Sequence, residues 1–141
     1  MEPNASLDIS YFEVLPAEEC WDLLRTHQIG RVAWHSSAGI SVLPVTFGVD
    51  EDQRIVFRTR PGSRLSELAA GGAVAFEVDW VADDAQVAWS VLARGEAGPV
   101  DQVPEVAAGL PVPWAPGERN LWLALTVSEI SGRAMSAEAP K

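Results

Sequence analysis

Turn-forming residues divide this chain of 141 residues into short segments, and this division limits the folds available to it. Ten prolines and eleven glycines stand between runs rich in valine, isoleucine, phenylalanine and tryptophan. Short runs of this kind predict many strands joined by hairpins rather than a bundle of long helices. Apolar residues make up 48% of the chain, which is enough for one hydrophobic core. The length fits a single domain, which we expect to span residues 1–141.

The hydrophobic pattern predicts six antiparallel strands and three short helical pieces. The strands are expected at residues 31–35, 40–49, 54–59, 73–80, 87–100 and 120–128. One helix is expected to begin at Pro16, to bury Trp21 and Leu24, and to end near residues 28–30; two shorter helices are expected at residues 63–70 and 104–110. Residues 1–11 and 134–141 are expected to form loose ends. These elements predict a mainly β fold, a six-stranded antiparallel barrel with flanking helices.

The chain is strongly acidic, with a formal net charge of -10. Nucleic acids and anionic membranes bind broad basic surfaces, so neither is an expected partner. No apolar run approaches the ~20 residues that cross a bilayer, and the first residues lack the pattern of a secretion signal. Cys20 is the only cysteine and there is no HExxH pattern, so we expect neither an intrachain disulfide nor a bound metal. These features predict a cytoplasmic protein.

Four arginines nevertheless gather within residues 54–64, whose sequence is RIVFRTRPGSR. The segment carries +4, which leaves -14 for the other 130 residues. It is predicted to run from a strand through a Pro-Gly-Ser turn into a short helix, and backbone N–H groups, a hydroxyl and guanidinium groups together favour a bound phosphate. The alternatives are a solvated charged face, weak surface ion pairs, or Ser63 acting as a helix N-cap. The four arginines are Arg54, Arg58, Arg60 and Arg64.

Aromatic and titratable side chains supply further candidates. Trp21 and Trp122 are expected in the core, whereas Trp34, Trp80, Trp89 and Trp114 are candidates for an aromatic cofactor site or an interface. His27 is expected to end the first helix and His35 to lie exposed beside a turn. Glu77 and Asp79 share one strand face, where they form either a carboxylate pair or the solvated side of the strand. No serine lies in a nucleophile-elbow pattern, so hydrolase chemistry is not expected.

Several segments in a fixed order carry a resemblance to a known family. They are GRVAW, SVLPVTFGVD, RIVFRT, RPGSRLSEL, VAFEVDW, WSVLARGEAGPV, PWAPGER and SGR, over residues 20–133. With these segments the chain resembles the pyridoxamine 5'-phosphate oxidase-like flavoproteins of the FMN-binding split β-barrel superfamily, and among them the small bacterial members. The resemblance implies a split β-barrel that forms a homodimer, with FMN bound in a groove between the two subunits.

The resemblance also implies where the cofactor would bind. The family's phosphate pattern is matched at Thr59, Gly62, Ser63 and Arg64, with arginine where lysine is common, and a basic residue is frequent at Arg58. The strand that lies along the isoalloxazine ring is matched at residues 44–46, a strand motif near the flavin at residues 89–91, and a loop that can reach the partner at Trp114 and Arg119. The implied cofactor-binding residues are Arg58, Thr59, Ser63, Arg64, Pro44, Val45, Thr46, Trp89, Ser90 and Trp114.

The function implied by the resemblance is that of an FMN-binding oxidoreductase acting on a small planar substrate. No residue is named as catalytic, and oxidation of vitamin B6 is not expected, because the longer C-terminal segment of the true oxidases is absent from this sequence. One alternative is a deazaflavin-dependent reductase, which would use Arg60 and Arg94 for a longer anionic tail. The others are a non-enzymatic flavin- or haem-binding module, with His35 as the haem ligand, and a scaffold that has lost its cofactor.

Overall fold

In the computed structural model, which describes residues 11–110 and 121–137, seven antiparallel strands form one sheet. The strands are β1 (Tyr11–Leu15), β2 (Ile29–Ser36), β3 (Gly39–Val49), β4 (Arg54–Thr59), β5 (Gly72–Ala82), β6 (Val87–Pro99) and β7 (Leu121–Ser136). The helices are α1 (Ala17–Arg25) and the 3₁₀-helices η2 (Arg64–Ala70) and η3 (Glu105–Gly109). The predicted mainly β, antiparallel class is confirmed, with one strand more than the six expected. None of the helices in the described ranges has the length and apolar character needed to cross a membrane.

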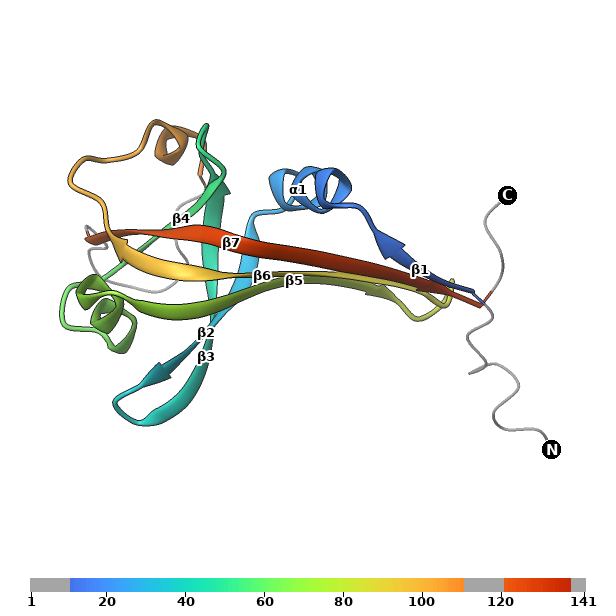
Figure 1. The fold of residues 1–141 in the computed structure, drawn as a ribbon, viewed down its shortest axis with the longest axis horizontal. Coiled ribbons are helices and arrows are strands. Elements are labelled where there is room, and N and C mark those ends of the chain that lie inside the picture. Colours follow the sequence, from blue (N-terminus) through green and yellow to red (C-terminus); the bar gives the residue numbers. More distant parts are fainter. Residues whose placement is uncertain (1–10, 111–120, 138–141) are drawn as a thin grey trace.

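The sheet closes into a barrel that is open along part of one strand. The strand order is β1-β7-β4-β3-β2-β5-β6, and a further pairing of β6 with β7 completes the ring. Figure 1 shows β5, β6 and β7 as long neighbouring strands, with α1 along one side and the β2–β3 hairpin projecting from the barrel. β3 pairs with β4 only over Phe47–Val49, whereas residues 39–46 of β3 pair only with β2. This divergence of β3 from β4 is the split in the barrel.

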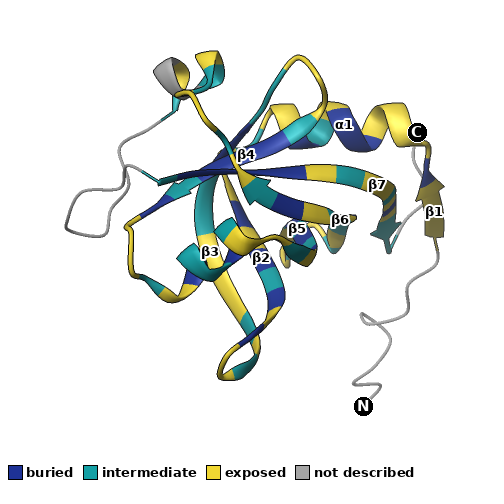
Figure 2. Cartoon of the chain, turned by 60° about the vertical axis from the view of Figure 1, so that its left-hand side comes forward, coloured by how far each residue is buried: buried dark blue, intermediate teal, exposed yellow. Residues whose placement is uncertain are grey.

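The core follows from the alternation of side chains along the strands. Along β4, Ile55, Phe57 and Thr59 are buried inside the barrel, as the sequence pattern predicts, and Arg54 and Arg58 lie on the outer face. Val56 is also buried, because it packs with Trp122 in a second small cluster beneath η3. Figure 2 shows buried positions concentrated inside the ring and exposed ones on the hairpin and β1.

β7 extends well beyond its predicted end at residue 128, because it has a partner on each side. Ala134–Ser136 pair with β6 and with β1, so these residues, and Tyr11 in β1, are not loose ends as predicted. Gly132 looks like a strand terminator in the sequence, but it is buried inside β7. A Cβ at this position would lie 2.6 Å from the Sγ of Cys20 on α1. The glycine therefore permits helix and strand to approach closely, and it does not end the strand.

α1 begins after Pro16 and buries Cys20, Trp21 and Leu24, as expected for its apolar face. It ends at Arg25, earlier than predicted, because the next two residues bond back to the last turn. The backbone N–H of Thr26 donates to the Leu23 carbonyl, and His27 Nδ1 lies 2.7 Å from the same oxygen. His27 thus lies two residues past the end of the helix, and its ring contacts a carbonyl of the last turn.

Gly95 marks a bulge in β6 that should not accept a side chain. The register shifts between Arg94 and Gly95, and a Cβ on Gly95 would overlap the carbonyl oxygen of Thr126. We expect Gly95→Ala to cost about 2–4 kcal/mol of unfolding free energy, measured by urea denaturation. Gly98→Ala, on the same strand with open space around it, should change stability by less than about 0.5 kcal/mol. Equal effects of the two substitutions would contradict this account of the bulge.

Candidate functional site

Two of the predicted phosphate-binding residues meet where β4 ends. Thr59 is buried, and its Oγ1 lies 2.8 Å from the Oγ of Ser63. The turn between them is closed by the Ser63 N–H, which donates to the Arg60 carbonyl at 3.1 Å, and Gly62 has a φ of +82°, which favours glycine. Ser63 precedes η2 but makes no side-chain capping bond. The Ser63 hydroxyl therefore bonds Thr59 and does not act as a helix N-cap.

The four arginines of the segment lie in different surroundings. Arg54 donates from Nε to Asp50 at 2.8 Å, so it belongs to the β3–β4 turn. Arg58 lies on the outer face of β4, with its guanidinium carbon 5.3 Å from the centre of the Trp122 ring. Arg60 and Arg64 are exposed. Because neighbouring strand residues point to opposite faces, the structure separates Arg58 from Thr59, although the sequence placed them in one site.

Arg64 takes part in a contact between η2 and the tip of the β2–β3 hairpin. Its Nη1 lies 3.5 Å from the Ser37 Oγ, and Glu67 accepts the Ser37 backbone N–H at 3.2 Å. Hydrogen bonding from Ser37 is the main cause that lowers the pKa of Glu67, and the charge of Arg64 adds to it. Sequence reasoning missed Ser37 and Glu67, because the hairpin tip and η2 are about thirty positions apart.

The strand predicted to lie along an aromatic cofactor forms the open edge of the barrel. Register places Pro44 opposite Arg31, Val45 opposite Gly30 and Thr46 opposite Ile29. The outer face here carries exposed apolar side chains beside Arg31 and His35: Ile29, Ile40 and Val42 are 49%, 85% and 55% exposed. These three residues and exposed Pro44 are called the β2–β3 apolar surface below. Apolar side chains this exposed on neighbouring strands indicate an interaction site.

The remaining predicted site residues are dispersed. Trp89 packs its ring against His27, with the ring centres 4.8 Å apart, on the α1 side of the sheet. Ser90 lies on the opposite face, between Asp79 and Arg133 in the register. Trp114 and Arg119 lie outside the described residues.

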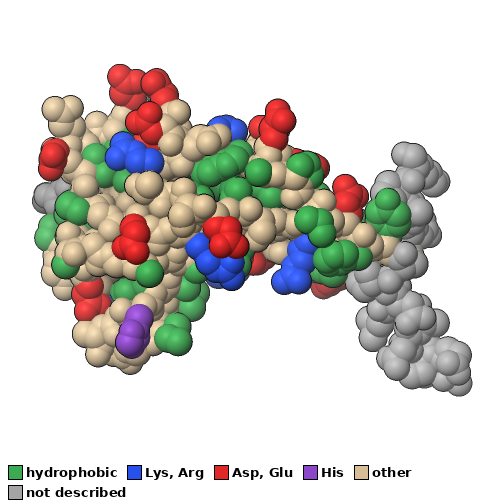
Figure 3. Space-filling model, viewed as in Figure 1, with side chains coloured by type: hydrophobic (Ala, Val, Ile, Leu, Met, Phe, Trp, Pro, Cys, Tyr) green, Lys and Arg blue, Asp and Glu red, His purple; other side chains and the backbone are tan. Residues whose placement is uncertain are grey.

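The structure also places the other tryptophan candidates and His35 in the core or at the surface. Trp34 is buried in the core, Trp80 is 48% exposed, and the core packing expected of Trp21 and Trp122 is confirmed. His35 is exposed next to the hairpin turn, as expected. On the face drawn in Figure 3, basic side chains stand as small separate patches among acidic and apolar ones.

A cluster of charges that the sequence did not reveal joins β2 to β5. Arg31 Nη1 lies 3.4 Å from Glu77 Oε1 and 3.2 Å from Asp79 Oδ2. The carboxylates are therefore an ion-paired, two-thirds covered pair and not merely the solvated side of a strand. Burial, and then the neighbouring Asp79, raise the pKa of Glu77 to about 7, although Arg31 opposes the shift. The spacing of Glu77 and Asp79 was a signal for the pair, but nothing in the sequence pointed to Arg31.

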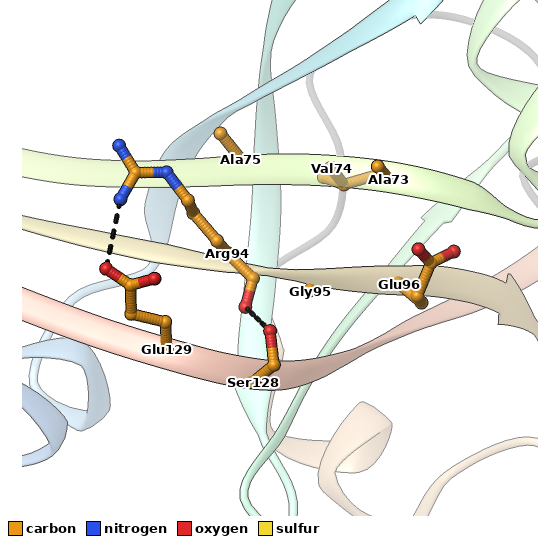
Figure 4. Close-up of a pocket in the computed structure, with 8 residues that line it drawn as sticks. All are labelled: Ala73, Val74, Ala75, Arg94, Gly95, Glu96, Ser128 and Glu129. Atoms are coloured by element: carbon orange, nitrogen blue, oxygen red, sulfur yellow. Dashed lines mark hydrogen bonds and ion pairs between the residues drawn. The ribbon is translucent and has the colours of Figure 1, made fainter.

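Two hollows lie on the outer face of the sheet. A hollow of about 240 Å³ is lined by Ile29, Gly30, Arg31, Pro44 and Asp79, so it joins the charge cluster to the open edge of β3. A wider one of about 420 Å³ lies over β5, β6 and β7 (Figure 4). In it Arg94 Nη1 lies 3.3 Å from Glu129 Oε1, so the arginine suggested for a longer anionic tail already has an acidic partner.

The raised pKa of Glu77 predicts how stability depends on pH. Between about pH 4.5 and 7 the folded chain retains a proton that the unfolded chain has lost, so this group's contribution to stability falls as pH rises through that window. Glu77→Gln, which mimics the protonated acid, should therefore be the more stable protein at pH 8, by on the order of 1 kcal/mol after allowance for solvent exposure. Below about pH 5 the advantage should vanish.

Urea unfolding at the two pH values measures this difference. The matched control is Glu96→Gln, the same substitution at an exposed residue of the next strand. A Glu77→Gln effect that is the same at both pH values would contradict the raised pKa.

Comparisons with known proteins agree with the fold. The family model described as pyridoxamine 5'-phosphate oxidase matches residues 16–134. No curated protein sequence matches the chain significantly. Among solved structures, an FAD binding protein from Mycobacterium smegmatis is similar at 28% identity and a TM-score of 0.68, over 88% of this chain and 98% of that one.

Two more distant structures share the fold. An FAD-binding protein from Mesorhizobium loti has a TM-score of 0.73 at 18% identity, over 89% of this chain and 98% of that one. An FAD and haem binding protein from M. smegmatis has a TM-score of 0.64 at 21% identity, over 89% and 74%. Because the family model spans most of the residues and flavin-binding proteins are among its structural neighbours, the chain belongs to the pyridoxamine 5'-phosphate oxidase family.

Proposed function

We propose that this protein binds FMN in a groove between two copies of the chain and acts as a flavin-dependent oxidoreductase on a small planar substrate. The observation that carries the proposal is the pair of hydroxyls of Thr59 and Ser63, 2.8 Å apart, at the end of β4. They lie directly before the exposed Arg64, in the segment that matches the family's phosphate pattern. The M. smegmatis neighbour at 28% identity, which binds FAD, supports a flavin as the ligand class.

The residues at this position suit a phosphate monoester. Two hydroxyls can each donate to a phosphate oxygen, and a guanidinium supplies charge and a bidentate fork. Because the Ser63 hydroxyl makes no capping bond, it can reorient toward a ligand without exposing a helix end. Glu67 holds the hairpin tip beside Arg64 by accepting the Ser37 N–H. In this proposal Arg58 makes no direct phosphate contact, because it stacks on Trp122 on the other face.

The open edge of β3 suits the ring of the cofactor. Residues 39–46 pair with β2 on one side only, so the backbone groups on the other side have no strand partner in the described sheet. Unpaired backbone N–H and C=O groups of an edge strand can bond a polar ring edge. We assign this part to Val45 and Thr46, with Pro44 as an apolar neighbour. A flavin bound here would supply two-electron transfer, while the chain binds it, orients it and limits access of water.

The phosphate of FMN is a monoester, whereas the riboflavin phosphate of FAD is part of a diphosphate. FAD is the second candidate cofactor, favoured by the neighbour that binds it. A deazaflavin remains an alternative, but its longer anionic tail would need Arg60 and Arg94. The ion pair between Arg94 and Glu129 lowers the positive charge available there. A non-enzymatic flavin-binding module would differ from our proposal by failing to pass electrons from reduced flavin to any acceptor.

Removing the guanidinium of Arg64 should weaken flavin binding. We expect Arg64→Ala to raise the dissociation constant for FMN by about 10–100-fold, because a charged hydrogen bond contributes about 1.5–3 kcal/mol. Quenching of flavin fluorescence measures the constant. The matched control is Arg54→Ala, which removes an arginine of the same segment that bonds Asp50 and should leave binding within about twofold. Equal losses in both variants would point to net charge and not to a phosphate site.

The β2–β3 apolar surface should form part of a homodimer interface. Val42 is 55% exposed, so Val42→Glu places a charge there without disturbing the core. Sedimentation equilibrium should show a dimer for the wild type and at least about tenfold weaker association for the variant. Val103→Glu, the same substitution at a residue 69% exposed elsewhere, should leave association unchanged. A wild type that stays monomeric would rule out the groove between subunits.

A further inference from the structure

The smaller hollow on the outer face offers a donor and an acceptor between two apolar walls. Its walls are Ile29 and Pro44, and its polar groups are Arg31 and Asp79, on neighbouring strands. The two are joined through Arg31 Nη1 and Asp79 Oδ2, 3.2 Å apart. Both bonds of Arg31 start from Nη1, so its Nη2 and Nε are available as donors. Asp79 also shares a side-chain hydrogen bond with Glu77, and its second oxygen, Oδ1, provides the acceptor. A donor and an acceptor side by side can form hydrogen bonds with an acceptor and a donor that are adjacent on a ligand.

The charge of the cluster favours a neutral ligand. Arg31 contributes one positive charge, and it faces Asp79 and Glu77. Across the sheet, Glu77 is opposite Leu92 and Asp79 is opposite Ser90, and neither of these partners is charged. The next charge in this direction is Arg133, which pairs with the far side of Ser90. The pKa of Glu77 is raised to about 7, so near neutral pH the cluster carries between zero and one negative charge. The two carboxylates would repel an anionic ligand here, and the guanidinium would repel a cationic one.

The geometry points to a binding site for the edge of a neutral planar ring in which a carbonyl stands next to an N–H, as in an imide or lactam. Arg31 donates to the carbonyl oxygen, Asp79 Oδ1 accepts the N–H, and the ring lies between Ile29 and Pro44. The inference rests on the proposed function, because this site lies at the same open edge of β3 that is proposed to bind the flavin. Two sources of such an edge are possible, the pyrimidine ring of the bound flavin itself and a planar substrate beside it.

The first arm of the test compares FMN with 3-methyl-FMN, which lacks the ring N–H. If the hollow reads the flavin, wild type should bind the methylated form at least about tenfold more weakly, and Asp79→Ala should bind both forms equally. Asp84→Ala, an exposed residue of the β5–β6 turn, is the matched control and should discriminate as wild type does. If Asp79→Ala does not fold, Asp79→Val replaces it, since a β-branched side chain suits a strand.

The second arm titrates the same proteins with lumazine, in the presence and absence of saturating FMN. Lumazine is a small planar molecule whose pyrimidine ring carries the same adjacent carbonyl and N–H groups. If the hollow reads a substrate, lumazine should bind FMN-loaded wild type and not Asp79→Ala, and methylation of FMN should have no effect. The inference is overturned if neither ligand distinguishes wild type from Asp79→Ala. If no flavin binds at all, the proposed function fails, but lumazine still decides the inference.

Discussion

The short pairing between β3 and β4 is the constraint on which the rest of this structure depends. Only Phe47–Val49 pair with residues of β4, and Phe47 and Phe57, opposite each other in that register, are both buried in the core. Fully buried aromatic side chains at this junction close the barrel on the inside. Beyond it the strands diverge, so one side of β3 is left open beside the turn that joins β4 to η2. The core and the open edge are thus two consequences of the same register.

Several arginines of the described residues are paired with a carboxylate or an aromatic ring. Arg31, Arg54 and Arg94 each have a carboxylate partner, and Arg58 lies on an indole ring. Such surface pairs contribute little to stability, but they reduce the charge available for a ligand. Arg64 differs, because its hydrogen bond is to the Ser37 hydroxyl at 3.5 Å, a weak bond that an anion could replace. Its charge also acts on the nearby Glu67, but no ion pair joins the two among the described residues. An acidic protein can in this way keep a guanidinium available without a broad basic surface.

The sequence pattern within a segment predicted the strand correctly where contacts with distant segments do not change it. β4 was predicted to the residue, because its alternation is uninterrupted and strong turn signals flank it. The same alternation places Arg58 and Thr59 on opposite faces of β4, so a common role for them at one cofactor stays a prediction. β7 was predicted too short because Ser131 and Gly132 look like a turn. Their strand conformation depends on β1, β6 and Cys20, which are distant in sequence.

Contacts between segments that are distant in the sequence could not be predicted from the sequence, for a physical reason. The pairing of β2 with β5 brings Arg31 to Glu77 and Asp79, which lie 46 and 48 positions later. The hairpin tip meets η2 through Ser37 and Glu67, again across about thirty positions. No local preference encodes such meetings, because they follow from the order of strands in the closed sheet. The resemblance to a flavoprotein family named candidate residues for a cofactor site, but it did not supply these partners.

The central claim is that this fold binds a flavin between two copies of the chain. The most direct test adds FMN to the purified protein, removes free flavin by size-exclusion chromatography, and records the absorption spectrum of the protein peak. The account predicts that oxidised-flavin bands elute with the protein at the mass of a dimer, with about one flavin for each chain. Flavin that elutes entirely apart from the protein, with the chain properly folded, would contradict it.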